Sequence, residues 1–278
     1  MTGFKYCFNT STIRGQKLSL PEEIDIVAQA GYHAIEPWIG EIEAYVQQGG
    51  SLADLKKRIA DVGLTVESSI GFAEWIVDDE ARRTKGLEQA RRDFELVQQI
   101  GGKRMAAPAA GATEVENIDY LKVAERYHAL LILGDHFGVV PQVEVWGFSK
   151  VLTRLGQAAF VAIESGHSQA CVLPDVYHLY KGGSNFAGLG LLNGNRIHVF
   201  HVNDYPDTPP RAAIKDSDRV YPGDGVAPLP EILAMLKQIG FHGHLSVELF
   251  NQKYWHQDPL LVAKTALEKL RSVAERVK

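Results

Sequence analysis

The chain has 278 residues, of which 45% are hydrophobic and 23% charged, and its formal net charge is −5. This is the composition of an ordinary globular protein, and the acidic balance argues against the basic surface that nucleic-acid binders need. No apolar run reaches the length of about 18 residues expected of a membrane span. The two cysteines, Cys7 and Cys171, and the absence of a signal-peptide pattern predict a reduced, cytoplasmic protein.

Short runs rich in β-branched residues alternate along the chain with longer amphipathic stretches. Strands are predicted at 5–9, 33–38, 65–70, 104–107, 139–146, 170–175, 196–203 and 244–250. Helices are predicted at 21–30, 52–62, 80–100, 117–136, 149–165, 228–239 and 258–276. Glycine follows most of these helices, as is usual at a helix C-terminus.

This alternation predicts an α/β fold with parallel strands, for which two architectures compete. A doubly wound sheet would usually carry a glycine-rich phosphate loop after its first strand, and the segment NTSTIRGQ there is not one. The glycine-rich segment 181–194 follows the sixth strand and is predicted to be a loop with a weak helix. We therefore expect a (β/α)₈ barrel, the TIM barrel, as a single domain over residues 1–278.

The longest irregular segment, 205–228, follows the seventh strand directly. A loop of this length inside a compact domain usually carries function.

The polar residues near several strand ends fall on one face of each strand. Side chains alternate along a strand, so every second one points into a barrel. In the eighth strand the leucines and the valine form the apolar face toward the helices, which turns Glu248 inward. The same alternation gives three more inward-facing residues at the ends of the fifth, sixth and seventh strands: Glu144, Asp175 and His201.

These four strand ends meet at the carboxyl end of a barrel, where the active sites of such folds lie. Three carboxylates gathered there would repel one another and lose hydration. One divalent metal ion removes this cost, and three oxygens with one nitrogen suit Mn²⁺, Mg²⁺, Co²⁺ or Zn²⁺. A single acid at a strand end is more often a helix N-cap, and a lone histidine is more often structural. Four such residues on consecutive strands favour the metal site.

Four further residues are predicted near the same pocket. His178 lies three residues after Asp175, on the loop leaving the sixth strand. Arg219 lies in the long loop, where it would orient substrate oxygens or, alternatively, bind loop carbonyls at the surface. Trp38 and Trp146 end the second and fifth strands and would either wall an apolar side of the pocket or plug the core.

At these residues the sequence resembles the xylose-isomerase-like family of sugar isomerases and epimerases. The segments VEVW, DVYHLYKGGSN, IHVFHVND, DRVYPGDG and IGFHGHLSVELFNQKYW are most similar to inosose isomerases. The resemblance implies the same four metal ligands, and it implies substrate contacts for His178, Arg219 and Glu36. One departure stands out: where ketose 3-epimerases carry a further glutamate after the fifth-strand ligand, this chain has WGFSK, with Lys150 near that place.

Residues and resemblance together predict an enzyme that moves a proton next to the carbonyl of a polyol ketone, an inosose or a ketose. Glu144 and Glu248 would act as general base and acid while the metal stabilises an enediolate. Isomerisation, epimerisation and the loss of water by an inosose dehydratase share this first step. The residue types leave the three outcomes open.

Two other classes of function fit less well. A nuclease acting at abasic sites would need several metal ions, more histidine ligands and a basic surface. A non-catalytic sugar-binding protein would not need the pair of glutamates. The expected partner is therefore a small sugar or cyclitol, without nucleic acid or membrane, and a homo-oligomer is left open.

Overall fold

The computed structural model describes residues 3–277, and parallel strands form its centre. They are β1 (Lys5–Asn9), β2 (Ala34–Glu36), β3 (Thr65–Val66), β4 (Arg104–Ala107), β5 (Val140–Glu144), β6 (Val172–Leu173), β7 (Val199–Val202) and β8 (His244–Val247). Continuous ladders run in the orders β3-β2-β1-β8-β7 and β4-β5-β6. Single parallel bridges, Ser69 to Met105 and Asp175 to His201, join the two groups. The strands thus close into a ring, and the predicted (β/α)₈ barrel is confirmed.

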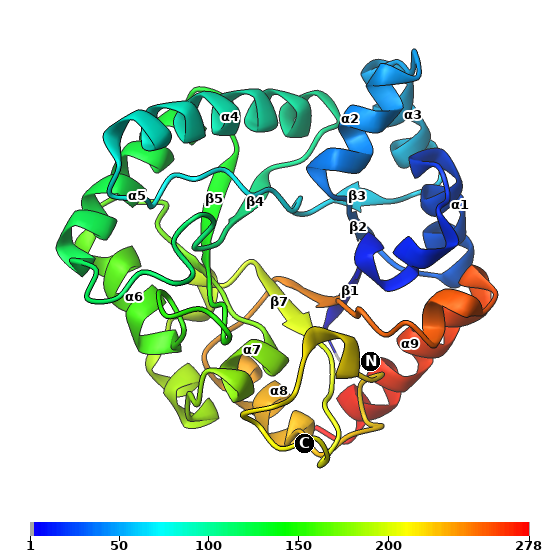
Figure 1. Ribbon diagram of the computed structural model, residues 1–278. Coiled ribbons are helices and arrows are strands. Elements are labelled where there is room, and N and C mark those ends of the chain that lie inside the picture. Colours follow the sequence, from blue (N-terminus) through cyan, green and yellow to red (C-terminus); the bar gives the residue numbers. More distant parts are fainter. Residues whose placement is uncertain (1–2, 278) are drawn as a thin grey trace.

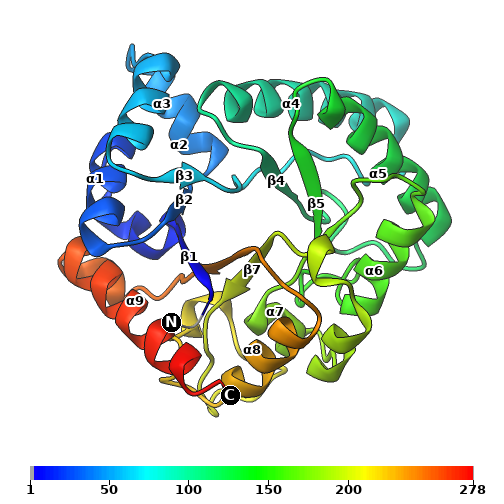
Figure 2. The same ribbon diagram turned by 180° about the vertical axis from the view of Figure 1, so that it is seen from behind.

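Helices surround this ring, and Figures 1 and 2 view the barrel from its two ends. They are α1 (Leu20–Ala30), α2 (Ile39–Gln47), α3 (Leu52–Asp61), α4 (Glu80–Gln99), α5 (Tyr120–Asp135), α6 (Leu155–Glu164), α7 (Val176–Lys181), α8 (Leu229–Gln238) and α9 (Pro259–Glu275). The last helix, α9, packs beside the first, α1, which closes the outer layer (Figure 1). The main apolar core fills the space between helices and strands.

A second, smaller apolar cluster lies inside the barrel. Ile70, Ala106, Leu173 and Val199 form it, from four different strand segments. Leu173 lies two residues before Asp175, and Val199 lies two residues before His201. Because side chains alternate along a strand, these pairs share the inward face. The predicted inward orientation of both polar residues therefore holds, one layer above the cluster.

Two helices were not predicted from the sequence, and both follow strand ends of the site. Helix α2 begins directly after Trp38, and α7 begins directly after Asp175. His178 therefore lies on α7 and not on a loop, which corrects the prediction. With only six residues, α7 is too short to show a helical period in the sequence.

Several strands end earlier than predicted, and proline is the reason in two of them. Pro37 and Pro174 directly follow β2 and β6, and a proline has no N–H to donate to a neighbouring strand. The predicted helix 149–165 begins only at Leu155, because the chain turns at Leu152, which has a left-handed φ of 55°. The segment 181–194 contains a 3₁₀ helix, Phe186–Leu191, as expected of a weak helix.

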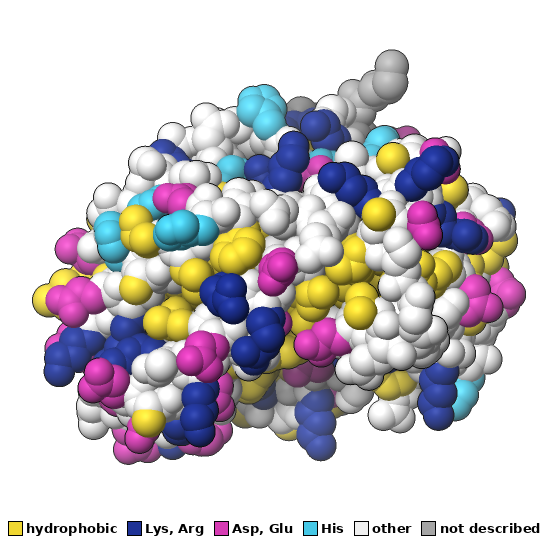
Figure 3. Space-filling model, turned by 90° about the horizontal axis from the view of Figure 1, so that it is seen from above, with side chains coloured by type: hydrophobic (Ala, Val, Ile, Leu, Met, Phe, Trp, Pro, Cys, Tyr) yellow, Lys and Arg dark blue, Asp and Glu magenta, His cyan; other side chains and the backbone are white. Residues whose placement is uncertain are grey.

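No described helix combines the length and the hydropathy that crossing a membrane requires. On the face shown in Figure 3, basic and acidic side chains are interspersed and do not gather into a patch of one sign.

Candidate metal centre

A cavity of about 140 Å³ opens at the carboxyl end of the barrel strands. Six of the residues predicted for the site line it: Trp38, Glu144, Trp146, His178, Arg219 and Glu248. Asp175 and His201 are fully buried next to it, and Glu36 lies deeper, below His201. The structure thus brings all the predicted site residues to one end of the barrel.

The two ring nitrogens of His201 have different surroundings. Nε2 lies 3.0 Å from Oε2 of Glu36, and a carboxylate can only accept, so Nε2 carries the proton. Nδ1 is buried without a hydrogen-bond partner. It lies 3.5 Å from Oε2 of Glu248 and 3.9 Å from Oδ2 of Asp175. In neutral His201, the free lone pair of Nδ1 therefore faces two carboxylate oxygens, an arrangement that a cation between them would stabilise.

The carboxylate of Asp175 does two things at once. Its Oδ1 accepts from the backbone N–H of His178 at 2.7 Å and caps the N-terminus of α7. Its Oδ2 accepts from Asn203 Nδ2 at 2.8 Å and from Arg219 Nη1 at 3.1 Å, and it faces His201. Asp175 is therefore both a helix N-cap, which is the plainer explanation for an acid at a strand end, and a member of the cluster.

The two glutamates differ in their positions. Glu248, directly after β8, accepts from Asn9 at 3.2 Å and from Arg219 at 2.8 Å. One ligand atom each of Asp175, His201 and Glu248 lies within 4.8 Å of the other two, which makes these three a possible metal-binding group. Glu144, at the end of β5, lines the cavity but lies outside this group, and its Oε2 is buried without a partner.

Arg219 supplies the positive charge of the site from a fully buried position. Its two terminal nitrogens donate to Asp175, Glu248, Asp216 and Nε2 of His178. These four contacts leave only Nε, which is buried and unpaired. The alternative of a surface arginine on loop carbonyls is wrong. Arg219 holds the carboxylates of the site in place, and its terminal N–H groups are already in use.

The pKa values at the site reflect burial and the mutual influence of its charged groups. Burial and the neighbouring carboxylates raise the pKa of Glu144 to about 8. Burial works to lower the pKa of His201, but Glu248 and Glu36 outweigh it and raise that pKa well above its usual value. Burial works to raise the pKa of Asp175, but Arg219, His178 and His201 together outweigh it and keep that pKa low.

This donor set fits a divalent metal ion. Two carboxylate oxygens and an unpaired imidazole nitrogen already converge, and the site holds more negative charge than Arg219 balances. Glu36 would fix the tautomer of His201 through Nε2, as the partner of a metal-bound histidine usually does. An ion here would be held by Asp175, His201 and Glu248.

Aromatic side chains form a further part of the cavity lining. Ring centroids are 5.2 Å apart between Trp38 and Phe72, 5.9 Å between Phe72 and Trp146, and 5.1 Å between Trp146 and Phe148. Both tryptophans line the cavity, and Trp38 also packs against the apolar cluster inside the barrel, so for Trp38 the two alternatives hold together. Lys150 pairs with Glu116 at 2.9 Å and is not among the lining residues.

Several residues of the site were missed from the sequence. Asn203 has the strand parity of His201 and could have been found by the same alternation, and so could Asn9 at the end of β1. Phe72 and Phe148 lie on segments between strands and helices, where no periodicity predicts direction.

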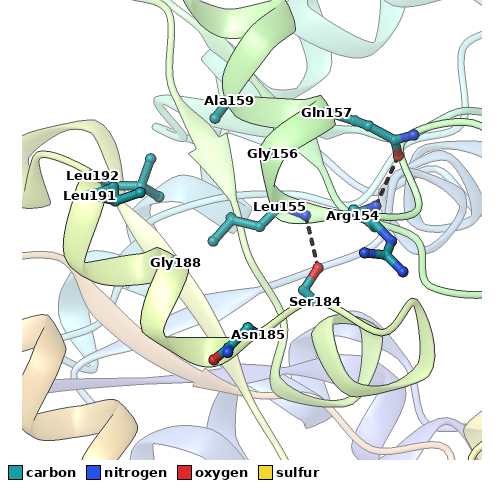
Figure 4. A pocket seen from close by; sticks show the side chains of 10 residues that line it. All are labelled: Arg154, Leu155, Gly156, Gln157, Ala159, Ser184, Asn185, Gly188, Leu191 and Leu192. Carbon is teal, nitrogen blue, oxygen red and sulfur yellow. Dashed lines mark hydrogen bonds between the residues drawn. The ribbon is translucent and has the colours of Figure 1, made fainter.

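A larger cavity, about 450 Å³, lies elsewhere, between α6 and the 3₁₀ helix Phe186–Leu191 (Figure 4). Leu155, Leu191 and Leu192 form much of its lining, and its only charged side chain is Arg154. Two hydrogen bonds there, Arg154 N to Gln157 and Leu155 N to Ser184, belong to the start of α6. By size alone this cavity would be the better candidate for a binding site, but the titratable groups converge at the smaller cavity.

Residues 24–273 match the family described as xylose isomerase-like TIM barrel, so the chain belongs to this family. The inosose isomerase of Bacillus velezensis is 25% identical over 276 residues, which cover 98% of each chain. The 3-dehydroshikimate dehydratase of Pseudomonas aeruginosa is 26% identical over 245 residues, 85% of this chain and 37% of that protein. The crystal structure of the IolI protein with a binding zinc atom is similar at a TM-score of 0.90 and 23% identity, over 99% of both chains. The prediction of an enzyme of the sugar isomerase and epimerase type is confirmed.

Proposed function

We propose that the chain is a divalent-metal-dependent enzyme that isomerises or epimerises a small polyol ketone, an inosose or a ketose. The observation that carries the proposal is Nδ1 of His201, buried and unpaired beside oxygens of Glu248 and Asp175. Mn²⁺, Mg²⁺, Co²⁺ and Zn²⁺ all accept such ligands. We include Glu144 as a fourth ligand, because it ends a strand at the same cavity. The bound zinc of the IolI structure supports the metal.

The shape of the cavity supports a small cyclic or short-chain polyol. Its volume, about 140 Å³, is below the range of about 300–1,000 Å³ that drug-sized ligands occupy. Its aromatic lining suits the C–H face of a sugar or cyclitol. Its polar lining, which includes Glu144, Glu248 and His178, suits hydroxyl and carbonyl groups. The inosose isomerase from Bacillus velezensis points to a cyclitol ketone.

The two cavity glutamates suit proton transfer next to a carbonyl. A bound divalent ion would supply Lewis-acid stabilisation of negative charge on the carbonyl oxygen. One carboxylate takes the proton from the adjacent carbon, and the C–H electron pair becomes part of the enediolate. Return of a proton to the neighbouring carbon moves the carbonyl, whereas return to the same carbon from the opposite face inverts it. Glu144 and Glu248 fill these roles.

Loss of a β-hydroxyl as water is the second candidate reaction. It begins with the same proton removal, and the dehydratase of Pseudomonas aeruginosa shares 85% of this chain's length in its alignment. In a polyol ketone the carbon that loses the proton carries a hydroxyl, so loss of the β-hydroxyl gives an enol that tautomerises to a diketone, a product that neither an isomerase nor an epimerase forms.

The test is NMR in D₂O of the metal-loaded protein with 2-keto-myo-inositol and a panel of ketoses. We expect deuterium in one of these compounds together with a shifted or inverted centre, and Glu144→Gln and Glu248→Gln should each abolish it. Glu43→Gln, the same change at an exposed position, should not. Absence of deuterium from every compound would contradict the proposal, and a product that has lost one water and gained a second carbonyl would show the dehydratase.

A further inference from the structure

A second polar cavity, of about 230 Å³, lies at the opposite end of the barrel, where the strands begin. Lys5 begins β1, Arg104 begins β4 and His244 begins β8, and all three line it. His198, one residue before β7, and Glu67, one residue after β3, complete its charged lining together with the exposed His242. This end of a barrel usually serves stability, for which apolar packing would be enough.

The cavity has donors that nothing in the described part of the protein satisfies. Nε of Arg104 is buried and makes no hydrogen bond. The ring of His198 has no hydrogen-bond partner among residues 3–277, and the ammonium group of Lys5 forms no ion pair with them. A buried donor without an acceptor is unfavourable, and an anion beside this guanidinium would stabilise it.

The charge of the lining selects the kind of ligand. Glu67 is the only acid of the cavity, and it already lies 3.3 Å from Arg104 Nη1 and 3.4 Å from His244 Nδ1. Lys5 and Arg104 together exceed it by one positive charge. Three histidines would suit a transition-metal ion, but a cation there would meet two cationic side chains. An anion meets the favourable sign.

The pKa values of two histidines in the cavity reflect burial and the nearby positive charges. Burial, Arg104 and Arg196 lower the pKa of His198 to about 4. Burial also lowers the pKa of His244 to about 4, with Lys5 and Arg104 adding to the effect of burial and Glu67 opposing it. Both imidazoles are therefore neutral near pH 7.

We propose that this cavity binds a small oxyanion such as inorganic phosphate, held by Arg104, Lys5 and His198. The guanidinium offers planar N–H donors, and Lys5 adds a point charge. The cavity lies at the opposite end of the barrel from the metal centre, and the two cavities share no lining residue. The proposal is therefore independent of the reaction at the other end.

The test follows the ring resonances of His198 and His244 by ¹H–¹³C NMR of the metal-loaded protein during titration with inorganic phosphate. These signals report this end of the barrel, so phosphate bound at the metal centre does not interfere. We expect saturable shifts, and Arg104→Gln should weaken binding about tenfold or more, as expected for a lost charge-assisted hydrogen bond. Lys5→Gln, at an exposed position where folding is not at risk, should weaken it less, and Lys264→Gln on α9 should not change it.

Sulfate as a second titrant distinguishes a general oxyanion site from one selective for phosphate. Either result supports the proposal if Arg104→Gln weakens the binding of phosphate. Phosphate shifts that are absent, or that persist unchanged in both Arg104→Gln and Lys5→Gln, would overturn it. Binding of Zn²⁺ at these histidines in the absence of any phosphate effect would overturn it as well.

Discussion

Glu36 accepts a hydrogen bond from Nε2 of His201 at 3.0 Å, although 165 positions separate the two residues in the chain. The same oxygen of Glu36 accepts from Ser246 at 2.8 Å and from Asn9 at 3.0 Å, so three side chains hold it in place. Glu36 is fully buried below His201, and it does not line the cavity. The geometry favours a role in orienting His201 over the substrate contact that the family resemblance implies.

Glu36→Gln should therefore weaken metal binding without removing a ligand. The glutamine amide can donate as well as accept, so it no longer requires the proton to be on Nε2. The tautomer of His201 with a free Nδ1 is then less favoured. We expect a 10- to 100-fold loss of metal affinity, typical for partners of metal-bound histidines, measured by competition with a chelating dye. Glu43→Gln is the control at an exposed site. Unchanged affinity in Glu36→Gln would refute the orienting role.

Arg219→Gln should destabilise the metal-free protein. The change leaves Asp175 and Glu248 buried without their cation, and breaking a buried pair in this way costs about 3–5 kcal/mol. Bound metal would restore part of the lost positive charge, so the deficit should shrink when Mn²⁺ is added. Urea denaturation with and without Mn²⁺ measures both values, with Arg211→Gln in an exposed loop position as control. A deficit that is equal with and without metal would show that the ion does not compensate these carboxylates.

Asp204→Asn should loosen the long loop that carries Arg219. The Asp204 carboxylate accepts hydrogen bonds from the backbone N–H groups of Tyr205, Gly223, Gly225 and Ala227, and its backbone pairs with Val220. An amide offers one oxygen without charge, so we expect a loss of about 1.5–3 kcal/mol. Hydrogen exchange should become faster at 219–228 and stay unchanged in α4. Exchange rates equal to those of the parent protein would show that Asp204 does not anchor the loop.

Asp93 on α4 makes the stability depend on pH. It is 1% exposed with Oδ2 unpaired, and burial raises its pKa to about 7. The folded state therefore keeps a proton that the unfolded state releases near pH 4, so this residue lowers stability as pH rises from about 4 to about 7. Asp93→Asn should raise the free energy of unfolding by about 1–3 kcal/mol at pH 8 and have little effect at pH 4. Glu95→Gln, exposed on the same helix, is the control; an equal gain at both pH values would exclude the ionisation of Asp93 as the cause.

The barrel and the orientation of Asp175, His201 and Glu248 could be predicted because strand alternation has a period of two, so one apolar face fixes the direction of every second residue. The partner of His201 could not be predicted in this way. The alternation of side chains along β2 predicts that Glu36 points inward. Which side chain it contacts depends on how β2 and β7 lie around the closed ring. Similarly, Glu144 has the predicted direction, yet its separation from the other three depends on the curvature of the barrel.

Helix α7 shows a different limit. Asp175 was predicted both as a candidate ligand and, more plainly, as a residue type that caps helices, and the two were treated as alternatives. They coexist because a carboxylate has two oxygens, one bound to the N–H of His178 and the other facing His201. A sequence pattern can indicate which residue matters, but it does not predict that the two oxygens of its carboxylate have different partners.

The most direct test of the metal centre is pulsed electron paramagnetic resonance of the protein loaded with Mn²⁺. We predict one Mn²⁺ per chain and a single strong ¹⁴N coupling, from Nδ1 of His201, that disappears in His201→Gln. A coupling that survives this substitution, or a protein that binds no stoichiometric Mn²⁺, Co²⁺ or Zn²⁺, would contradict a metal site built on Asp175, His201 and Glu248.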